Sequence, residues 1–475
     1  MPPANYLAER ETLTQLLYES PYDPCLYLGR ARCYEHLGFP DLAAGDAYRA
    51  LLLTDEAQDE SGEYHEQVLE AFSEARNGGR EEGQMNGACN GNGHTNGHEP
   101  ASGKKRNSEN GSDDESEVEG HNSAVQQIAI AYALESYQKL AQNLAHCGCL
   151  RSAFDFCQRG SKAFPKASSL NDTRQAILAT NRETQLQRDP SWDESSFDPK
   201  TDLPDEGSVR RELYPWNTHE PDRFSATTLS ALNAELQKAA PKCAVQPISL
   251  PLLTSSNPPK TTIQQLGLFA TADIPPGDVV LTESSLLTAN NRHLHPLCDA
   301  CSRDLPPLTP SSHPYACPSC PDTVFCSAPC LALAQTHYHP AICGKDIDAV
   351  GKDTPAPDAA NALYLLLLFR AVALAETQAT HPLDLRETKY LWGDFVHPDR
   401  GYLHSASAAA EPLSVARHLP FSFRFNVLAP LHVLEKMDVD VFAPTALRRY
   451  DGWVLNTLYA KFRGTASARL IAIRM

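Results

Sequence analysis

Small and aromatic residues recur with the same spacing in two stretches of the N-terminal third of the chain. The matching residues are Tyr27, Ala31, Gly38, Ala43 and Ala50 in one stretch and Tyr137, Ala141, Gly148, Ala153 and Gly160 in the other. Small residues at this spacing let two antiparallel helices pack closely, and the glycine ends the first helix at the turn. The pattern predicts helix–turn–helix units at 24–54 and 134–165, with flanking helices near 6–18, 60–76 and 168–187.

The pattern of apolar positions breaks down between these two units. Residues 77–123 are rich in Gly, Asn, Ser, Asp and Glu and contain almost no aliphatic side chains. Such a segment buries too little apolar surface to offset the entropy lost on ordering. We therefore predict a disordered insertion at 77–123 within a helical domain at 1–187.

The pattern changes again after this helical domain. Residues 188–260 are rich in proline, which predicts a linker. From 261 the sequence predicts a strand over 264–270, a turn at Pro275–Gly277 and a second strand at 279–283, which together form a hairpin. After a cysteine-rich segment we expect a helix near 358–376, starting after Asp358, and mostly helical sequence to about 463.

Length, charge and hydropathy exclude some classes of protein. At 475 residues the chain is long enough for roughly three domains of about 150 residues each. A net charge of −18 argues against a general nucleic-acid-binding surface. The longest apolar run, Ala362 to Phe369, is too short to cross a bilayer, so we expect a buried helix and no membrane association. The first residues carry charges where a secretory signal needs an apolar core, which favours a cytoplasmic or nuclear protein with reduced thiols.

The cysteine-rich segment at 298–343 contains four closely spaced pairs of metal-ligand residues. Two are C-x2-C pairs, one is a C-x3-C pair and one is an H-x3-C pair; in chain order they are Cys298 and Cys301, Cys317 and Cys320, Cys326 and Cys330, and His339 and Cys343. Tetrahedral zinc takes four such ligands, and short spacers let one turn supply two of them. Eight ligands predict two closed, structural zinc sites. The alternative, a set of unpaired or disulfide-linked cysteines, is disfavoured by this regular spacing.

The order of these pairs, with Phe325 before the third one, resembles a MYND zinc finger inserted into a SET domain. By this resemblance the ligands interleave. Cys298, Cys301, Cys326 and Cys330 would hold one zinc ion, and Cys317, Cys320, His339 and Cys343 the other. His337 competes with His339 for the second site, and the H-x3-C spacing favours His339.

The flanking sequence is similar to other parts of the same family. The hairpin at 266–283 resembles the first hairpin of a SET domain, in which Gly267 would approach S-adenosylmethionine. The segment 344–455 resembles the helical insert of that domain, and Asn456 matches a residue that contacts the cofactor. The helical units in front resemble tetratricopeptide repeats, an arrangement found in fungal-type members. The resemblance implies a multidomain α+β protein in which 261–475 is a partial, β-rich SET domain, with lysine methylation as the family's activity.

The sequence also departs from the SET pattern. No Asn-His dipeptide occurs in it, and the Asn-His-Ser-Cys and Glu-x-Tyr motifs of the second SET half are absent. We therefore expect this chain to stop before that half and to have no catalytic residue. By the same reasoning, S-adenosylmethionine would bind only to a complete form.

Two functions follow from these patterns. The first is membership of the SET-type protein-lysine methyltransferases, acting on a lysine-bearing protein, with the catalytic C-terminal half missing from this chain. The second is a non-catalytic zinc-binding adaptor that binds peptides, including proline-rich ones, through its tetratricopeptide-like helices and its finger. A DNA-binding regulator is a weaker third alternative, because the chain is acidic.

Overall fold

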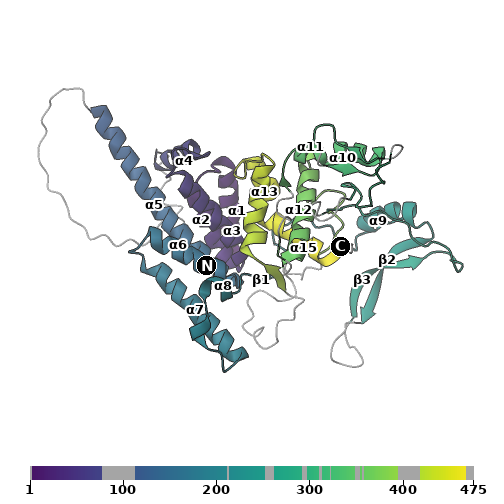
Figure 1. Cartoon of the computed structure of the whole chain (residues 1–475), viewed down its shortest axis with the longest axis horizontal. Coiled ribbons are helices and arrows are strands. Elements are labelled where there is room, and N and C mark those ends of the chain that lie inside the picture. The colour runs from purple at the N-terminus through teal and green to yellow at the C-terminus, as the bar shows by residue number, and fades with distance from the viewer. Residues whose placement is uncertain are drawn as a thin grey trace, which may run out of the picture. The chain divides into compact units, whose positions relative to one another are not determined.

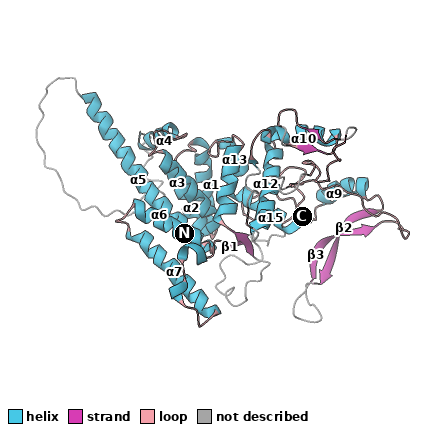
Figure 2. Ribbon diagram, in the orientation of Figure 1, coloured by secondary structure: helices cyan, strands magenta, loops and turns pink. Residues whose placement is uncertain are grey.

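The described part of the chain is mostly helical. The computed structural model describes residues 3–77, 113–210, 213–251, 262–290, 297–309, 313–320, 323–347, 354–355, 358–393 and 418–466. Over these residues the protein is a mostly helical α+β protein, and its strands form three two-stranded sheets (Figures 1 and 2). Most of the predicted disordered insertion lies outside the described residues.

The chain divides into two compact units. The first, the helical unit, comprises Met1–Glu212 and Gly401–Trp453. The second, the finger unit, comprises Leu213–Arg400 and Val454–Met475. These divisions differ from the predicted boundaries after 187 and 260, because segments that are far apart in the sequence pack together within each unit.

Within the described residues, seven helices from the N-terminal part build most of the helical unit. In chain order they are α1 (Pro3–Glu19), α2 (Pro24–Leu37), α3 (Pro40–Glu56), α4 (His65–Asn77), α5 (Asp113–Cys147), α6 (Leu150–Ala163) and α7 (Ser168–Arg188). The pairs α2–α3 and α5–α6 form helical hairpins, and α3 packs against α5. The predicted packed helices are therefore confirmed, including the flanking helices α1, α4 and α7.

The two hairpins share one turn geometry. Gly38 follows α2 with a φ of 76°, and Gly148 follows α5 with a φ of 87°. In each turn the glycine N–H donates to the carbonyl three residues earlier, and the next N–H donates to the carbonyl five residues before it. This left-handed helix end is easily adopted only by glycine. The predicted role of both glycines is confirmed.

Helix α5 begins earlier than the sequence pattern predicts. Its backbone is helical from Asp113, although 113–123 falls in the predicted insertion. Extending an existing helix adds one hydrogen bond for each residue fixed, so it needs no new nucleation and no apolar side chains. Figure 1 shows the resulting long helix, which continues well past the end of α6.

The helical unit also contains a segment from late in the chain. Strand β1 (Gly207–Arg210) pairs antiparallel with β6 (His418–Phe421), with Gly207 opposite Phe421. Short helical elements complete the unit, namely η1 (Glu194–Ser196), α8 (Pro199–Asp202), the π-helix η7 (Arg424–Leu428), α13 (Ala429–Lys436) and α14 (Pro444–Tyr450). Sequence alone assigned 418–453 to an insert of the C-terminal domain. The β1–β6 pairing and the buried contacts of Asp451 instead place it with the N-terminal helices.

The finger unit begins with α9 (Ala226–Ala239) and a hairpin formed by β2 (Cys243–Pro251) and β3 (Thr262–Ala270). The predicted hairpin between 264–270 and 279–283 is therefore wrong, since β3 pairs with β2 and residues 279–283 form no strand. The predicted turn is present, with Asp278 N–H donating to the Pro275 carbonyl and a φ of 92° at Gly277. The prolines of β2 argued against a strand there in the sequence. A two-stranded sheet tolerates them because each strand has one edge that forms no ladder hydrogen bonds.

The core of the finger unit is helix α12 (Ala359–Gln378), which starts after Asp358 as predicted. Among the described residues, α12 alone is long and apolar enough to span a membrane, and 67% of its most apolar 18-residue stretch is buried inside the structure. Helices α10 (Ala328–His337) and α11 (His339–Ile342) pack against α12. Helix α15 (Gly452–Thr465) supplies Lys461, whose ammonium group pairs with Glu220 at 2.7 Å in the same unit.

Candidate metal centres

Two tight turns present the C-x2-C pairs. At the first, Cys298 N–H donates to the Arg303 carbonyl at 2.8 Å and Ser302 N–H donates to the Cys298 carbonyl at 2.9 Å. The second pair follows strand β4 (Tyr315–Ala316), and Cys317 N–H donates to the Thr323 carbonyl at 3.2 Å. Both turns bring two sulfur atoms to one side of the backbone within four residues, as short spacers allow.

The remaining ligands come from a short strand and two helices. Strand β5 (Val324–Phe325) pairs with β4 and leads directly into Cys326. Ser327 caps α10 by accepting a hydrogen bond from the N–H of Cys330, which lies in the first turn of that helix. His339 begins α11, and Cys343 follows its end. The local folding of β5, α10 and α11 thus positions four ligands.

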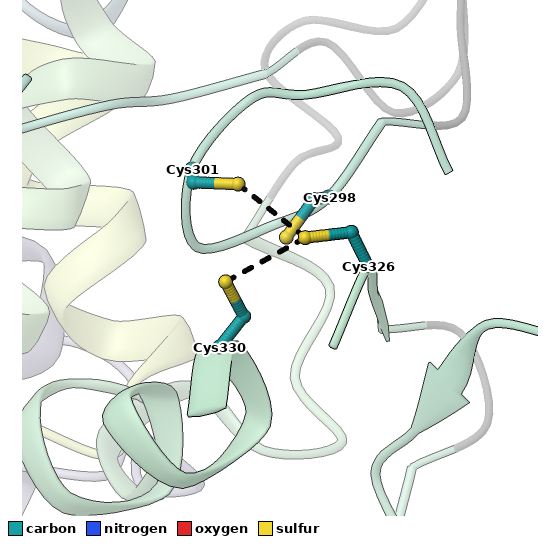
Figure 3. A group of neighbouring side chains, drawn as sticks. All are labelled: Cys298, Cys301, Cys326 and Cys330. Carbon is teal, nitrogen blue, oxygen red and sulfur yellow. Dashed lines mark hydrogen bonds between the residues drawn. The ribbon is translucent and has the colours of Figure 1, made fainter. Parts of the chain in front are cut away.

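The first cluster contains four cysteines whose sulfur atoms converge, as Figure 3 shows. Its members are Cys298, Cys301, Cys326 and Cys330. The Sγ atom of Cys326 lies 3.6 Å from that of Cys301 and 3.7 Å from that of Cys330. Cys298 is buried, and the other three side chains are partly exposed.

The second cluster contains three cysteines and one histidine, namely Cys317, Cys320, His339 and Cys343. The Sγ atoms of Cys317 and Cys343 are 3.9 Å apart, and Cys320 Sγ lies 3.2 Å from His339 Nε2. The structure brings His339 to this cluster, with its side chain 3% exposed. His337 is exposed instead, and its Nδ1 atom lies 3.0 Å from the Leu333 carbonyl.

The geometry of both clusters fits tetrahedral zinc. In each cluster all four ligand atoms lie within 4.8 Å of one another. A tetrahedral zinc with Zn–S bonds of about 2.3 Å would place its sulfur ligands about 3.8 Å apart, close to the observed contacts. The two clusters are therefore consistent with two structural zinc sites, one with four cysteines and one with three cysteines and a histidine. Four protein ligands at each site leave no open position for water or substrate.

Contacts among the clustered sulfur atoms shift the pKa values of these thiols in both directions. Burial raises the pKa of Cys326, but hydrogen bonds with Cys298, Cys301 and Cys330 outweigh it and lower the pKa below its usual value. Burial, followed by hydrogen bonds to neighbouring thiols, raises the pKa of Cys343 to about 12. Several thiolates gathered in one cluster would repel one another electrostatically. A divalent cation offsets that repulsion, which is the chemistry expected of a zinc site.

A buried polar group connects the first cluster to the core of the unit. Asp299 lies between the ligands Cys298 and Cys301 and is 5% exposed. Its carboxylate accepts a hydrogen bond from the Tyr338 hydroxyl at 2.7 Å and is also contacted by Arg370 of α12. Phe325, predicted as the aromatic residue of the finger, is fully buried, and its ring meets the His339 ring edge-on.

The two predicted cofactor-binding residues lie on separate elements. Gly267 lies on β3 opposite Gln246 of β2, and a Cβ atom added at Gly267 would lie 2.7 Å from the Phe269 ring. Asn456 lies on α15 and is partly exposed. Neither residue belongs to a cluster of metal-ligand side chains. The close approach of Phe269 is a local packing reason for a glycine at this position.

The structure also brings together three residues that the sequence analysis missed. In the finger unit, the side chains of His219, His381 and Asp384 lie close enough together to share one metal ion. The H-x2-D spacing of His381 and Asp384 is a weak signal, and His219 is too distant in the sequence to be linked to them by spacing.

Comparison with known proteins finds no matching family model, curated protein or solved structure. The likeness to MYND and SET proteins therefore rests on the motifs in the sequence.

Proposed function

We propose that this protein is a zinc-stabilised adaptor that binds peptide segments of other proteins in the cytoplasm or nucleus. The observation that carries the proposal is the closed ligand set of both metal clusters. A zinc ion with four protein ligands has no free position for chemistry, so its contribution is to fold the finger. The finger then acts through the surface that it presents.

The surface of the finger supports binding of an apolar or proline-rich peptide. Three large apolar side chains are exposed there, with relative exposures of 83% for Leu308 and 46% each for Tyr315 and Leu333. Tyr315 lies on β4 and Leu333 on α10, and these two elements pack against each other. Exposed aromatic and aliphatic side chains are the usual contacts of extended proline-rich peptides.

The helical unit supports the same function. Its two helical hairpins pack side by side through α3 and α5, which is the way tetratricopeptide-like units stack. Stacked helical hairpins are a common scaffold for peptide recognition. We propose that the helical unit provides a second binding surface, so that the protein connects two partners.

Peptide binding by the finger can be tested on the full chain loaded with zinc. An immobilised library of proline-rich peptides would be probed first, and the selected peptides would be measured by calorimetry. Replacing both Tyr315 and Leu333 with serine should weaken binding at least about tenfold, because each supplies apolar contact area. Leu250→Ser is a matched control, since Leu250 is 42% exposed on β2, outside the cysteine-rich segment 298–343. Absence of binding, or equal loss in the control, would reject this role of the finger.

A second candidate is membership of the S-adenosylmethionine-dependent protein-lysine methyltransferases, although this chain lacks the Asn-His-Ser-Cys and Glu-x-Tyr motifs of that family's second SET half. The order of elements along the chain favours it, because the strand that carries Gly267 precedes the finger, and helix α15 with Asn456 follows it. Both residues would then lie at the edge of a cofactor site. Calorimetric titration of the full chain with S-adenosylmethionine tests it directly. Binding that Gly267→Val weakens would support this function, whereas no binding would leave the adaptor as the function of this chain.

A further inference from the structure

We propose that His219, His381 and Asp384 form a third metal site, distinct from the two clusters of the finger. One potential ligand atom from each residue lies within 4.8 Å of the other two. The site would bind one zinc-like divalent cation. This inference does not depend on the adaptor or methyltransferase functions proposed above.

His219 contacts the side chains of both other residues directly. His219 Nδ1 lies 2.8 Å from Asp384 Oδ2. The rings of His219 and His381 are stacked, with centroids 3.9 Å apart and an angle of 5° between their planes. The His219 and Asp384 side chains are 27% and 38% exposed, so a cation from solvent can reach them.

The loop that carries His219 is held in place by contacts on both sides of it. Asn217 Oδ1 accepts a hydrogen bond from the His219 N–H at 2.9 Å. Glu220, the next residue, pairs with the buried ammonium group of Lys461, and that ammonium also donates to the Leu391 carbonyl at 2.6 Å. The Pro221 carbonyl accepts a hydrogen bond from the Trp392 indole at 3.2 Å. A metal site needs ligands held near their binding positions, and these contacts provide that support.

The other two ligands come from one tight turn after α12. Asp384 N–H donates to the His381 carbonyl at 2.9 Å, which places both side chains on the same turn. Leu383 and Leu385, beside Asp384, are each only 1% exposed and anchor this turn. The Leu383 N–H donates a hydrogen bond to His381 Nδ1 at 3.2 Å. A metal at Nδ1 would take the same lone pair, and a metal at Nε2 would leave the ring proton on Nδ1. Metal binding at either nitrogen would therefore break this one hydrogen bond.

The chemistry of the donor set favours a borderline metal ion. Two imidazoles and one carboxylate are common ligands of catalytic or exchangeable zinc. Three protein ligands leave at least one position for water or another ligand, unlike the closed clusters of the finger. Lys389 Nζ lies 3.9 Å from Asp384 Oδ1 and would compete with the cation for the carboxylate. We therefore expect the third metal ion to exchange more readily than the two structural zinc ions.

Cobalt titration of the full chain tests the site. The protein would first be dialysed against a weak chelator until only tightly held zinc remains, at two ions per chain. Added Co²⁺ should then bind at one further equivalent and give visible d–d absorption without the sulfur-to-cobalt charge-transfer band of thiolate sites. Calorimetry with Zn²⁺ would measure its affinity in the same preparation.

Single substitutions identify the ligands. His219→Gln, His381→Gln and Asp384→Asn should each weaken binding of the third ion at least about tenfold while the two tight zinc ions stay bound. Lys389→Met should strengthen it. His432→Gln is the matched control, because His432 also lies near a carboxylate, 3.7 Å from Glu435, and should leave binding unchanged.

Three results would overturn the proposal. One is saturation at two metal ions per chain. Another is a thiolate charge-transfer band on the third equivalent of cobalt. The last is a third equivalent that binds equally well to all three ligand variants.

Discussion

Arg370 of helix α12 donates three hydrogen bonds to Asp299, the residue between two ligands of the first metal cluster. Arg370 Nη1 lies 2.9 Å from the Asp299 carbonyl, and Nη2 lies 3.0 Å from each carboxylate oxygen. The two side chains are 8% and 7% exposed. The Arg370 guanidinium also lies over the Tyr338 ring, 3.8 Å from its centroid. The fold of the finger and the packing of the core helix are therefore coupled through one buried ion pair.

Substituting Arg370 with methionine should destabilise the finger unit. Removing one partner leaves the Asp299 carboxylate buried without its counter-charge, which typically costs about 3–5 kcal/mol. Thermal unfolding of the zinc-loaded chain should show the loss, and a chelator should remove zinc faster from the variant. Arg386→Met is the control, because Arg386 and its partner Glu235 are 65% and 52% exposed and solvent screens such a pair. Equal effects of the two substitutions would contradict the coupling.

Replacing Cys317 with serine should reduce the tightly held zinc from two ions per chain to one. Serine is a poor zinc ligand, and a structural zinc site contributes about 10–16 kcal/mol of folding free energy in small zinc modules. Elemental analysis after dialysis measures the loss, and circular dichroism should show the helical unit unchanged. Cys243→Ser is the control, since Cys243 is a buried cysteine of β2 outside both clusters. Full zinc content in the Cys317 variant would refute the assignment of this ligand.

Two glycine-to-alanine substitutions should have opposite effects on the helical unit. At Gly148, with a φ of 87°, alanine adopts the left-handed conformation at a cost of about 1–2 kcal/mol. Its Cβ would also lie 3.2 Å from the Gly207 Cα. At Gly45, inside α3, an added Cβ meets no atom within 4 Å, and alanine should stabilise the helix by about 0.5–1 kcal/mol. Urea unfolding measures both changes, and equal signs would contradict the turn geometry.

The stability of the helical unit should fall in acid partly because of Asp451. Burial raises the pKa of this carboxyl, but the charges of Arg30, Arg49 and Arg10 outweigh it, so its pKa lies below the ordinary value. A lowered folded-state pKa gives stability that is complete above the unfolded value of about 3.9 and is lost as the pH falls through the folded value. Asp451→Asn should therefore reduce stability at neutral pH and flatten its decline in acid.

Hydrogen exchange of α2 peptides, measured from neutral pH down to about pH 3, would report this change within the helical unit. Asp155→Asn removes an exposed carboxylate of α6 and serves as the control. It should leave the exchange of α2 at the wild-type level. If stability falls as steeply in acid in the Asp451 variant as in the unmodified protein, other carboxyls account for the fall.

The spacing of residues along the chain was sufficient to predict the local features of this protein. The helices of the first unit, their glycine turns and the pairing of metal ligands within each turn depend on residues only a few positions apart. Backbone geometry alone then decides whether two side chains share a helix face or a turn. The same local reasoning failed at β3, because a strand pattern does not say which other strand completes the sheet.

Tertiary structure alone decided which distant residues meet. Arg30 of α2 forms hydrogen bonds with both Asp46 and Asp451, the latter 421 positions away, with Nη1 and Nη2 each 3.1 Å from an oxygen of Asp451. His219 likewise meets Asp384, 165 positions later. Local patterns leave such pairs undetermined, because they form only when packing of the whole unit closes the long loop between them and burial makes an unpaired charge costly. The sequence by itself determined the helices and the eight candidate ligands; the packed structure decided the partners of β3, Arg30 and His219.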